Sequence, residues 1–171
     1  MEKKKDDNIQ INISKKNLII GIVSVILVGG LIFLASYASN GYGSGKNAYK
    51  FTDITIDEYL ELMKNEEKQI VYLSKIGCPW CEKENPIIKK LGTDYNLKIY
   101  HLDATNFFDN ATNQYTEDGL KLINSHELYS GGYGTPNTLI VQNGDIVDYI
   151  DHYAEEKDLL ELFKNNGFIN E

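Results

Sequence analysis

The most uniform run of apolar positions in the chain is Leu18–Tyr37, which has 20 residues and no charged side chain. At about 1.5 Å per residue, a helix of this length spans a hydrocarbon core of roughly 30 Å, so the run predicts a transmembrane helix. Lys15 and Lys16 precede the run, and no basic residue follows it before Lys46. This bias predicts a cytoplasmic N-terminus and a C-terminal portion outside the cytoplasm.

A cleaved signal peptide is the alternative interpretation of this run. Ser36 and Ala38 offer small residues at the spacing of a cleavage site, but the run exceeds the roughly 7–15 apolar residues of such signals. Either interpretation exports the remainder of the chain. The expected segments are a cytoplasmic tail over residues 1–17, a transmembrane helix over 18–37, a flexible tether rich in Gly, Ser and Asn over 38–48, and a folded domain over 49–171.

The first half of the folded domain alternates between strand and helix patterns. A weak strand is expected over Tyr49–Ile54, and the β-branched and aromatic run Gln69–Ser74 is typical of a buried central strand. Thr55 and Glu58 fit a capping box, which predicts a helix between these two strands. A second helix is expected over Pro79–Leu91, with a proline acceptable in its first turn.

The second half predicts a strand, a loop, a helix, a hairpin and a last helix. These are expected over residues 97–102, 103–115, 116–126, 138–152 and 154–166, respectively. Asn143-Gly144 between two apolar runs is a strong signal for a hairpin turn. The resulting order β-α-β-α-β-α-β-β-α predicts an α/β fold with a central mixed sheet flanked by helices. It also places Cys78 and Cys81 where a central strand ends and a helix begins, a usual position for a site in such sheets.

Charge argues against a nucleic-acid partner. The chain carries a formal charge of -8, and the portion from Gly41 onward has 12 Lys and no Arg against 22 Asp or Glu, a charge of -10. Binding to phosphate needs a surplus of basic side chains on one face. The acidity is therefore interpreted as a source of solubility.

The two cysteines of the chain, Cys78 and Cys81, have the spacing C-x-x-C. In an exported setting they are expected to form a disulfide with each other. Such a short bridge closes too small a loop to stabilise the fold appreciably. At the start of a helix, backbone amides and the helix dipole would favour a Cys78 thiolate, which predicts a nucleophile. Cys81, one turn later, could resolve a mixed disulfide formed at Cys78.

The cysteine pair has two other interpretations besides redox chemistry. A zinc site would need two further ligands, and His101, His126 and His152 do not have metal-motif spacing. A purely structural disulfide is the other alternative. The pattern favours redox chemistry, with no metal and no cofactor expected.

The strand Gln69–Ser74 followed by Gly77-Cys78-Pro79-Trp80-Cys81, and later by Tyr133-Gly134-Thr135-Pro136, resembles the thioredoxin superfamily. The resemblance covers about Tyr49–Phe168 and implies a thioredoxin-like fold. It implies that Pro136 follows a cis peptide bond and faces the cysteine pair. It also implies that the Thr135 backbone offers strand-like pairing to a substrate.

The chain departs from thioredoxins proper in two respects. They have Gly-Pro between the cysteines and a buried Asp in the preceding strand, whereas here the dipeptide is Pro79-Trp80 and Tyr72 stands at the matching offset. The sequence therefore shows no evident group for proton transfer to Cys81. Glutaredoxins share Cys-Pro-aromatic-Cys, but their glutathione-binding basic residues are not apparent. The plan of anchor, tether and Gly-Cys-Pro-x-Cys is also similar to the bacteriocin-transport accessory proteins of Gram-positive bacteria, which are implicated in disulfide handling of exported peptides.

The expected function is that of a membrane-anchored thiol-disulfide oxidoreductase that forms or exchanges disulfides in exported proteins or peptides. A membrane or extracytoplasmic electron donor or acceptor is the second expected partner. Trp80 is expected beside Cys78 as an exposed apolar platform for substrate. Glu82 and Glu84 disfavour a nearby thiolate and Lys83 favours it, which indicates an intermediate redox poise. The alternatives are a membrane-tethered disulfide reductase and a non-catalytic thioredoxin-fold binding module.

Two further features outside the cysteine motif carry structural expectations. His101 lies in a predicted strand and is expected to be a satisfied core or edge histidine, not a proton shuttle. The aromatic pair Phe107-Phe108 is expected to anchor its loop onto the core, with a partner-binding patch as the alternative.

Overall fold

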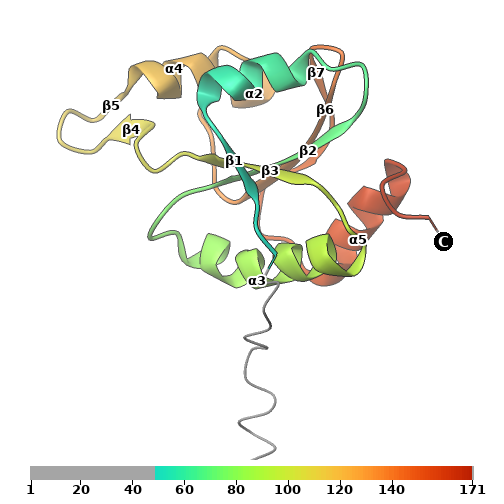
Figure 1. The fold of residues 1–171 in the computed structure, drawn as a ribbon. Helices are drawn as coiled ribbons and strands as arrows, with labels where there is room; N and C mark the ends of the chain where they lie inside the picture. The colour runs from blue at the N-terminus through green and yellow to red at the C-terminus, as the bar shows by residue number, and fades with distance from the viewer. Residues whose placement is uncertain (1–48, 171) are drawn as a thin grey trace, which may run out of the picture. The chain divides into compact units, whose positions relative to one another are not determined.

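A five-stranded mixed sheet lies between two layers of helices in the computed structural model, which describes residues 49–170 (Figure 1). The strands are β1 (Thr52–Ile54), β2 (Gln69–Ser74), β3 (Ile99–Asp103), β4 (Phe108–Asp109), β5 (Gln114–Tyr115), β6 (Asn137–Gln142) and β7 (Asp145–Ile150). The helices are α2 (Ile56–Met63), α3 (Pro79–Asp94), α4 (Glu117–Ile123), the 3-10 helix η1 (Glu127–Tyr129) and α5 (Glu156–Asn165).

The predicted tail, transmembrane helix and tether lie outside the described residues. Among residues 49–170, no helix combines the length and the apolar character needed to cross a bilayer.

The main sheet has the strand order β1-β3-β2-β6-β7. β1, β3 and β2 run parallel, whereas β6 is antiparallel to both β2 and β7. Asn143 and Gly144 have φ angles of 53° and 86° and form the turn of the β6–β7 hairpin, so the hairpin prediction is confirmed. The sheet is mixed and central, as the order of elements predicted.

Two hydrophobic cores lie on the two faces of the sheet. Side chains alternate along β2, so Val71 and Leu73 pack under α2 and α4, whereas Ile70 and Tyr72 pack against α3 and α5. Figure 1 shows this division, with α2 and α4 on one side of the sheet and α3 and α5 on the other. Because both faces of β2 are covered, this strand is apolar along almost its whole length, which identified it in the sequence.

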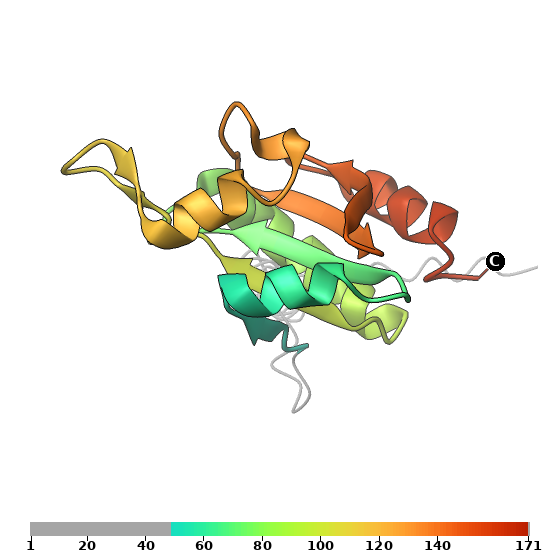
Figure 2. The ribbon, with the colours of Figure 1, turned by 90° about the horizontal axis from the view of Figure 1, so that it is seen from above.

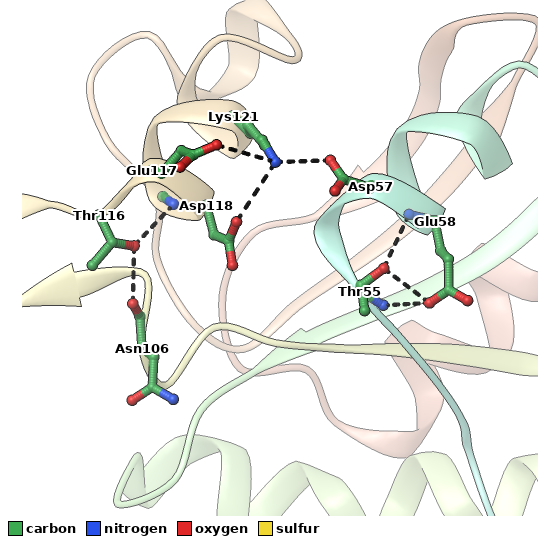
Figure 3. A network of polar contacts seen from close by, with 9 residues as sticks. Thr55, Asp57, Glu58, Asn106, Thr116, Glu117, Asp118 and Lys121 are labelled. Carbon is green, nitrogen blue, oxygen red and sulfur yellow. Dashed lines mark hydrogen bonds and ion pairs between the residues drawn. The ribbon is translucent and has the colours of Figure 1, made fainter.

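Helix α2 begins at the predicted capping box. The backbone N–H of Glu58 donates to Thr55 Oγ1 at 3.2 Å, and the Thr55 N–H donates to the Glu58 carboxylate at 2.7 Å. Figure 3 shows the neighbouring cation, Lys121 of α4, which bridges to Asp57 of α2 at 2.9 Å. This ion pair joins the two helices at the surface but contributes little stability by itself.

The predicted loop over residues 103–115 contains a small hairpin, β4–β5, which projects from the domain (Figure 2). Its turn is stabilised locally, because the Asp109 carboxylate accepts hydrogen bonds from the Ala111 N–H and the Thr112 hydroxyl, both at 2.8 Å. The rings of Phe108 and Tyr115 pack edge to face across the hairpin. Phe107 is buried in the core beneath α4, so the predicted anchoring of this loop is confirmed.

Candidate redox site

The two cysteines form a disulfide at the N-terminal end of α3. Gly77, with a φ of +73°, turns the chain out of β2 in a conformation that favours glycine. Cys78 is the N-cap of α3, and the Cys81 N–H donates to Cys78 Sγ at 3.2 Å. Pro79 occupies the first turn, where its missing N–H removes no helical hydrogen bond. The predicted disulfide and the predicted helix start are both confirmed.

Pro136 lies on the loop that faces this disulfide. The Thr135–Pro136 peptide bond is cis, as the resemblance implied. The Thr135 carbonyl oxygen lies 3.4 Å from Cys78 Sγ. The sequence places these residues 57 positions apart, and the antiparallel pairing of β6 with β2 brings them together.

Exposure differs sharply within the Cys-Pro-Trp-Cys segment. Cys78 and Cys81 are 5% and 4% exposed, whereas Trp80 is 52% exposed. The Trp80 ring packs on Tyr153, with centroids 5.4 Å apart, and the Lys83 ammonium lies 4.3 Å from the ring centroid. An apolar, partly exposed surface therefore adjoins the disulfide, where the sequence predicted a platform beside Cys78.

Glu84 is a buried carboxylate one helical turn after Cys81. It is fully buried, and its oxygens accept hydrogen bonds from the Ala154 N–H at 2.7 Å and the Thr138 hydroxyl at 3.3 Å. Burial raises the pKa of Glu84 to about 7, although these hydrogen bonds and the nearby His152 oppose the increase. Residues three apart on a helix lie about 5–6 Å apart at Cβ, so Glu84 and Cys81 are neighbours on the buried face of α3.

Tyr72 occupies the place that the sequence assigned to it, in β2 beneath the start of α3. Its hydroxyl donates to the Cys81 carbonyl oxygen at 3.4 Å. Burial and the charge of Glu84 both raise the pKa of Tyr72, so this phenol stays protonated near neutral pH. Tyr72 therefore binds the first turn of α3 through its hydroxyl and is not suited to exchange a proton with Cys81 near neutral pH.

The place of Glu84 in the site is not evident from the sequence. There Glu84 is only one of the charges that oppose a thiolate, and the buried acid of thioredoxins lies in the strand, not in the helix. The spacing of three residues from Cys81 could have placed Glu84 on the same helical face. Its hydrogen-bond donors, however, come from β6 and from the segment before α5, which only the tertiary structure brings close.

Cys81 also lines an open cavity of about 540 Å³ between α3 and the β1–β3 side of the sheet. Polar side chains line part of this cavity, among them Ser74, Asn85 and His101. Within residues 49–170, no cluster of three or more His, Cys, Asp or Glu side chains has the arrangement of a metal site.

Comparison with known proteins identifies similar folds among solved structures. The chain is similar to thioredoxin f2 of Chlamydomonas reinhardtii at 11% identity, covering 71% of this chain and 100% of that one with a TM-score of 0.52. The short form of spinach chloroplast thioredoxin f matches at 16% identity, over 71% of this chain and 97% of that one, with a TM-score of 0.50. Thioredoxin of Trypanosoma brucei brucei matches at 11% identity, over 72% and 96%, with a TM-score of 0.50. No protein-family model and no curated protein sequence matches the chain.

These similarities confirm the predicted thioredoxin-like fold. Nearly the whole length of each thioredoxin aligns with the folded domain. At identities of 11–16% they bear on the fold alone, so the chemistry must be argued from the site itself.

Proposed function

We propose that the chain is a thiol-disulfide oxidoreductase that forms or exchanges disulfides in exported proteins or peptides through Cys78 and Cys81. The observation that carries this proposal is a disulfide that caps a helix N-terminus beside an exposed aromatic side chain and a cis-proline loop. A bridge that encloses two residues adds little to stability, so its position needs a chemical explanation.

The proposed reaction begins with a substrate thiolate that attacks Cys78 Sγ. A bond forms between the substrate sulfur and Cys78, the Cys78–Cys81 bond breaks, and Cys81 leaves with the electron pair. A second substrate thiolate then attacks the substrate sulfur of this mixed disulfide and releases the Cys78 thiolate. The substrate is oxidised by two electrons and the cysteine pair is reduced, so an external electron acceptor must restore the disulfide.

Cys78 is the better placed of the two cysteines for nucleophilic exchange. It is the N-cap of α3, where backbone N–H groups and the helix dipole favour a thiolate. Cys81 lies in the first turn of the helix, three residues after Cys78, and its N–H donates to Cys78 Sγ. This position suits the role of the resolving cysteine. Pro79 shapes this first turn, and Trp80 offers substrate an apolar surface next to Cys78.

Substrate pairing is proposed along the loop that carries the cis-proline. Thr135 and Pro136 border Cys78, with the Thr135 carbonyl oxygen 3.4 Å from its sulfur. An extended substrate segment could add main-chain hydrogen bonds there, and such pairing orients a substrate sulfur without demanding a particular side chain.

Glu84 is proposed to exchange the proton of Cys81. When Cys81 leaves as a thiolate it needs a proton, and when it attacks a mixed disulfide it must lose one. A buried carboxyl group whose pKa is raised to about 7 can serve in both directions near neutral pH. Glu84 thus supplies the proton-transfer group that the sequence analysis did not find.

Membrane attachment belongs to the same proposal. The uncharged run over residues 18–37 and its flanking lysines support a single-pass anchor with a cytoplasmic N-terminus and an extracytoplasmic domain. The proposed partners are exported cysteine-containing proteins or peptides and a membrane or extracytoplasmic electron donor or acceptor.

The reduction potential of the Cys78–Cys81 couple tests the function. The full chain, purified in detergent, would be equilibrated with glutathione and dithiothreitol buffers, and its free thiols would be trapped and counted. We expect a value between about -230 and -120 mV, the range of disulfide-exchanging and oxidising proteins. A value near -270 mV would favour the reductase, and one below about -300 mV would contradict an enzymatic role.

A further inference from the structure

Asp53, His101 and Ser74 form a continuous hydrogen-bonded chain across three neighbouring strands. His101 Nδ1 lies 2.7 Å from Asp53 Oδ1, and His101 Nε2 lies 2.8 Å from Ser74 Oγ. The strand order β1-β3-β2 brings the three together, with Asp53 and His101 directly paired. With its proton on Nδ1, His101 donates to Asp53 and accepts from the Ser74 hydroxyl. This is the arrangement that activates a serine nucleophile.

Ser74 and His101 both line the 540 Å³ cavity. A small molecule that enters this cavity can therefore contact the hydrogen-bonded residues. Asn85 of α3 lines the same cavity, and its buried Oδ1 has no hydrogen-bond partner among the described residues. This oxygen is an acceptor, so it can take a hydrogen bond from a ligand with an N–H or O–H group. A nucleophile, a base and an orienting carboxylate therefore border one cavity.

The cavity fits an uncharged ligand of modest size. Its walls carry three cations and three anions, which balance in charge: Lys50, Lys75 and Lys89, and Asp53, Glu82 and Asp103. Phe51 adds an aromatic surface and packs on the His101 ring, with centroids 5.4 Å apart. These features favour a small neutral ester with an apolar portion over a charged substrate.

A second histidine shows what a purely structural pair looks like in this fold. His126 Nε2 lies 2.7 Å from Asp145 Oδ1, and its Nδ1 accepts from the Leu128 N–H at 3.0 Å. Both nitrogens of His126 are thus committed to the carboxylate and the backbone. His101 differs because its Nε2 is hydrogen-bonded to the hydroxyl of Ser74, a residue that lines the cavity.

We propose that Ser74, His101 and Asp53 are a second catalytic site, which hydrolyses small uncharged carboxylic esters. Ser74 Oγ attacks the carbonyl carbon and its proton passes to His101 Nε2. The ester C–O bond then breaks, and the leaving alcohol takes that proton. Water attacks the acyl-serine with His101 again as base, releasing the carboxylic acid and restoring Ser74. No oxidant, reductant or metal takes part, so the reaction neither forms nor breaks the Cys78–Cys81 bond, although Cys81 lines the same cavity.

The first test is labelling of the oxidised full chain in detergent with a fluorophosphonate. Ser74 would form an O–P bond as fluoride leaves, and trypsin would release the label on the peptide Gln69–Lys75, which has one serine. Because both cysteines are in the disulfide, no thiol competes. We expect labelling at Ser74 in the unaltered chain, and a loss of about a hundredfold in His101→Gln. The matched variant His126→Gln should label like the unaltered chain.

The second test is hydrolysis of p-nitrophenyl acetate by the oxidised chain. Ser74→Ala should abolish hydrolysis above background, and Asp53→Asn should lower it by about tenfold, less than for a buried triad carboxylate because Asp53 is exposed. Ser74→Ala should leave disulfide exchange unchanged, which separates this site from the proposed redox function. Failure of Ser74 to label in the folded chain, equal labelling in His101→Gln, or equal hydrolysis by Ser74→Ala would each overturn the proposal. The labelling result needs no variant to fold.

Discussion

The two faces of the sheet are built differently. On the α2/α4 face, the largest buried side chains are Tyr59 and Tyr129, and the charged groups form a capping box and ion pairs at the surface. On the α3/α5 face, polar and reactive groups enter the interior: Cys81, Glu84 and, at the edge, His101. The first face is a scaffold, whereas the second carries the residues of the proposed chemistry.

The comparison shows how burial separates inert from reactive polar groups. Burial raises the pKa of Tyr59 to about 12, which moves its titration further from neutral pH. Burial raises the pKa of Glu84 to about 7, which moves its titration into the working range. The same desolvation therefore keeps the Tyr59 phenol protonated at neutral pH and brings the titration of the Glu84 carboxyl group close to neutral pH.

The largest effect is expected at the redox site, from Cys78→Ser. This change removes the sulfur that substrate thiolates attack, so exchange activity should fall by about a thousandfold or more. The measurement is the rate of disulfide exchange with a model peptide dithiol, with folding checked by circular dichroism. Thr55→Ala on the α2/α4 face is the control and should exchange at the rate of the unaltered chain. Residual exchange near that rate in Cys78→Ser would contradict the assignment of the nucleophile.

The next effect concerns Glu84→Gln and the pH dependence of stability. Because the pKa of Glu84 is about 7 in the fold against 4.5 as its ordinary value, the folded state holds this proton more tightly than the unfolded state. Stability is therefore lost as the pH rises from 4.5 through 7, by about 3 kcal/mol in total. Glu84→Gln should lack this loss.

The measurement is denaturant unfolding of the oxidised chain at pH 5 and pH 8, followed by the fluorescence of Trp80, the one tryptophan in the sequence. Glu82→Gln is the matched control, because Glu82 is an exposed acid on the same helix and should leave the pH dependence unchanged. An identical pH dependence in Glu84→Gln and the unaltered chain would place the titration elsewhere.

The sequence predicted the scaffold better than the site. The reason is the separation along the sequence between the residues that interact. The Thr55 capping box, the strand Gln69–Ser74 and the Asn143-Gly144 turn depend on residues within a few positions of each other, and all three are confirmed. The proposed role of Glu84 depends on donors 54 and 70 residues away, and the proposed role of His101 depends on a serine 27 residues away. Local periodicity carries no information about such partners. The cysteine spacing therefore predicted the disulfide and the resemblance implied the cis-proline, but neither identified Glu84 or the partners of His101.

A smaller effect is expected on the scaffold face from Gly119→Ala. A Cβ at Gly119 would collide with the carbonyl oxygen of Phe107, which is backbone and cannot move aside easily. We expect a loss of about 2 kcal/mol in the free energy of unfolding and no change in the reduction potential. Gly131→Ala is the control, because nothing lies within 4 Å of its added Cβ. A shifted potential in Gly119→Ala would show that the two faces are coupled.

The smallest effect is expected from Thr55→Ala at the start of α2. The change removes the hydroxyl that accepts the Glu58 N–H and should cost about 1 kcal/mol of unfolding free energy. Thr93→Ala is a matched control on the other face, since Thr93 is exposed on α3 and alanine has the higher helix propensity, so this change should be neutral or slightly stabilising. Both variants should keep the reduction potential, because neither touches the disulfide. Equal losses from both threonines would mean that the cap contributes nothing beyond an ordinary surface position.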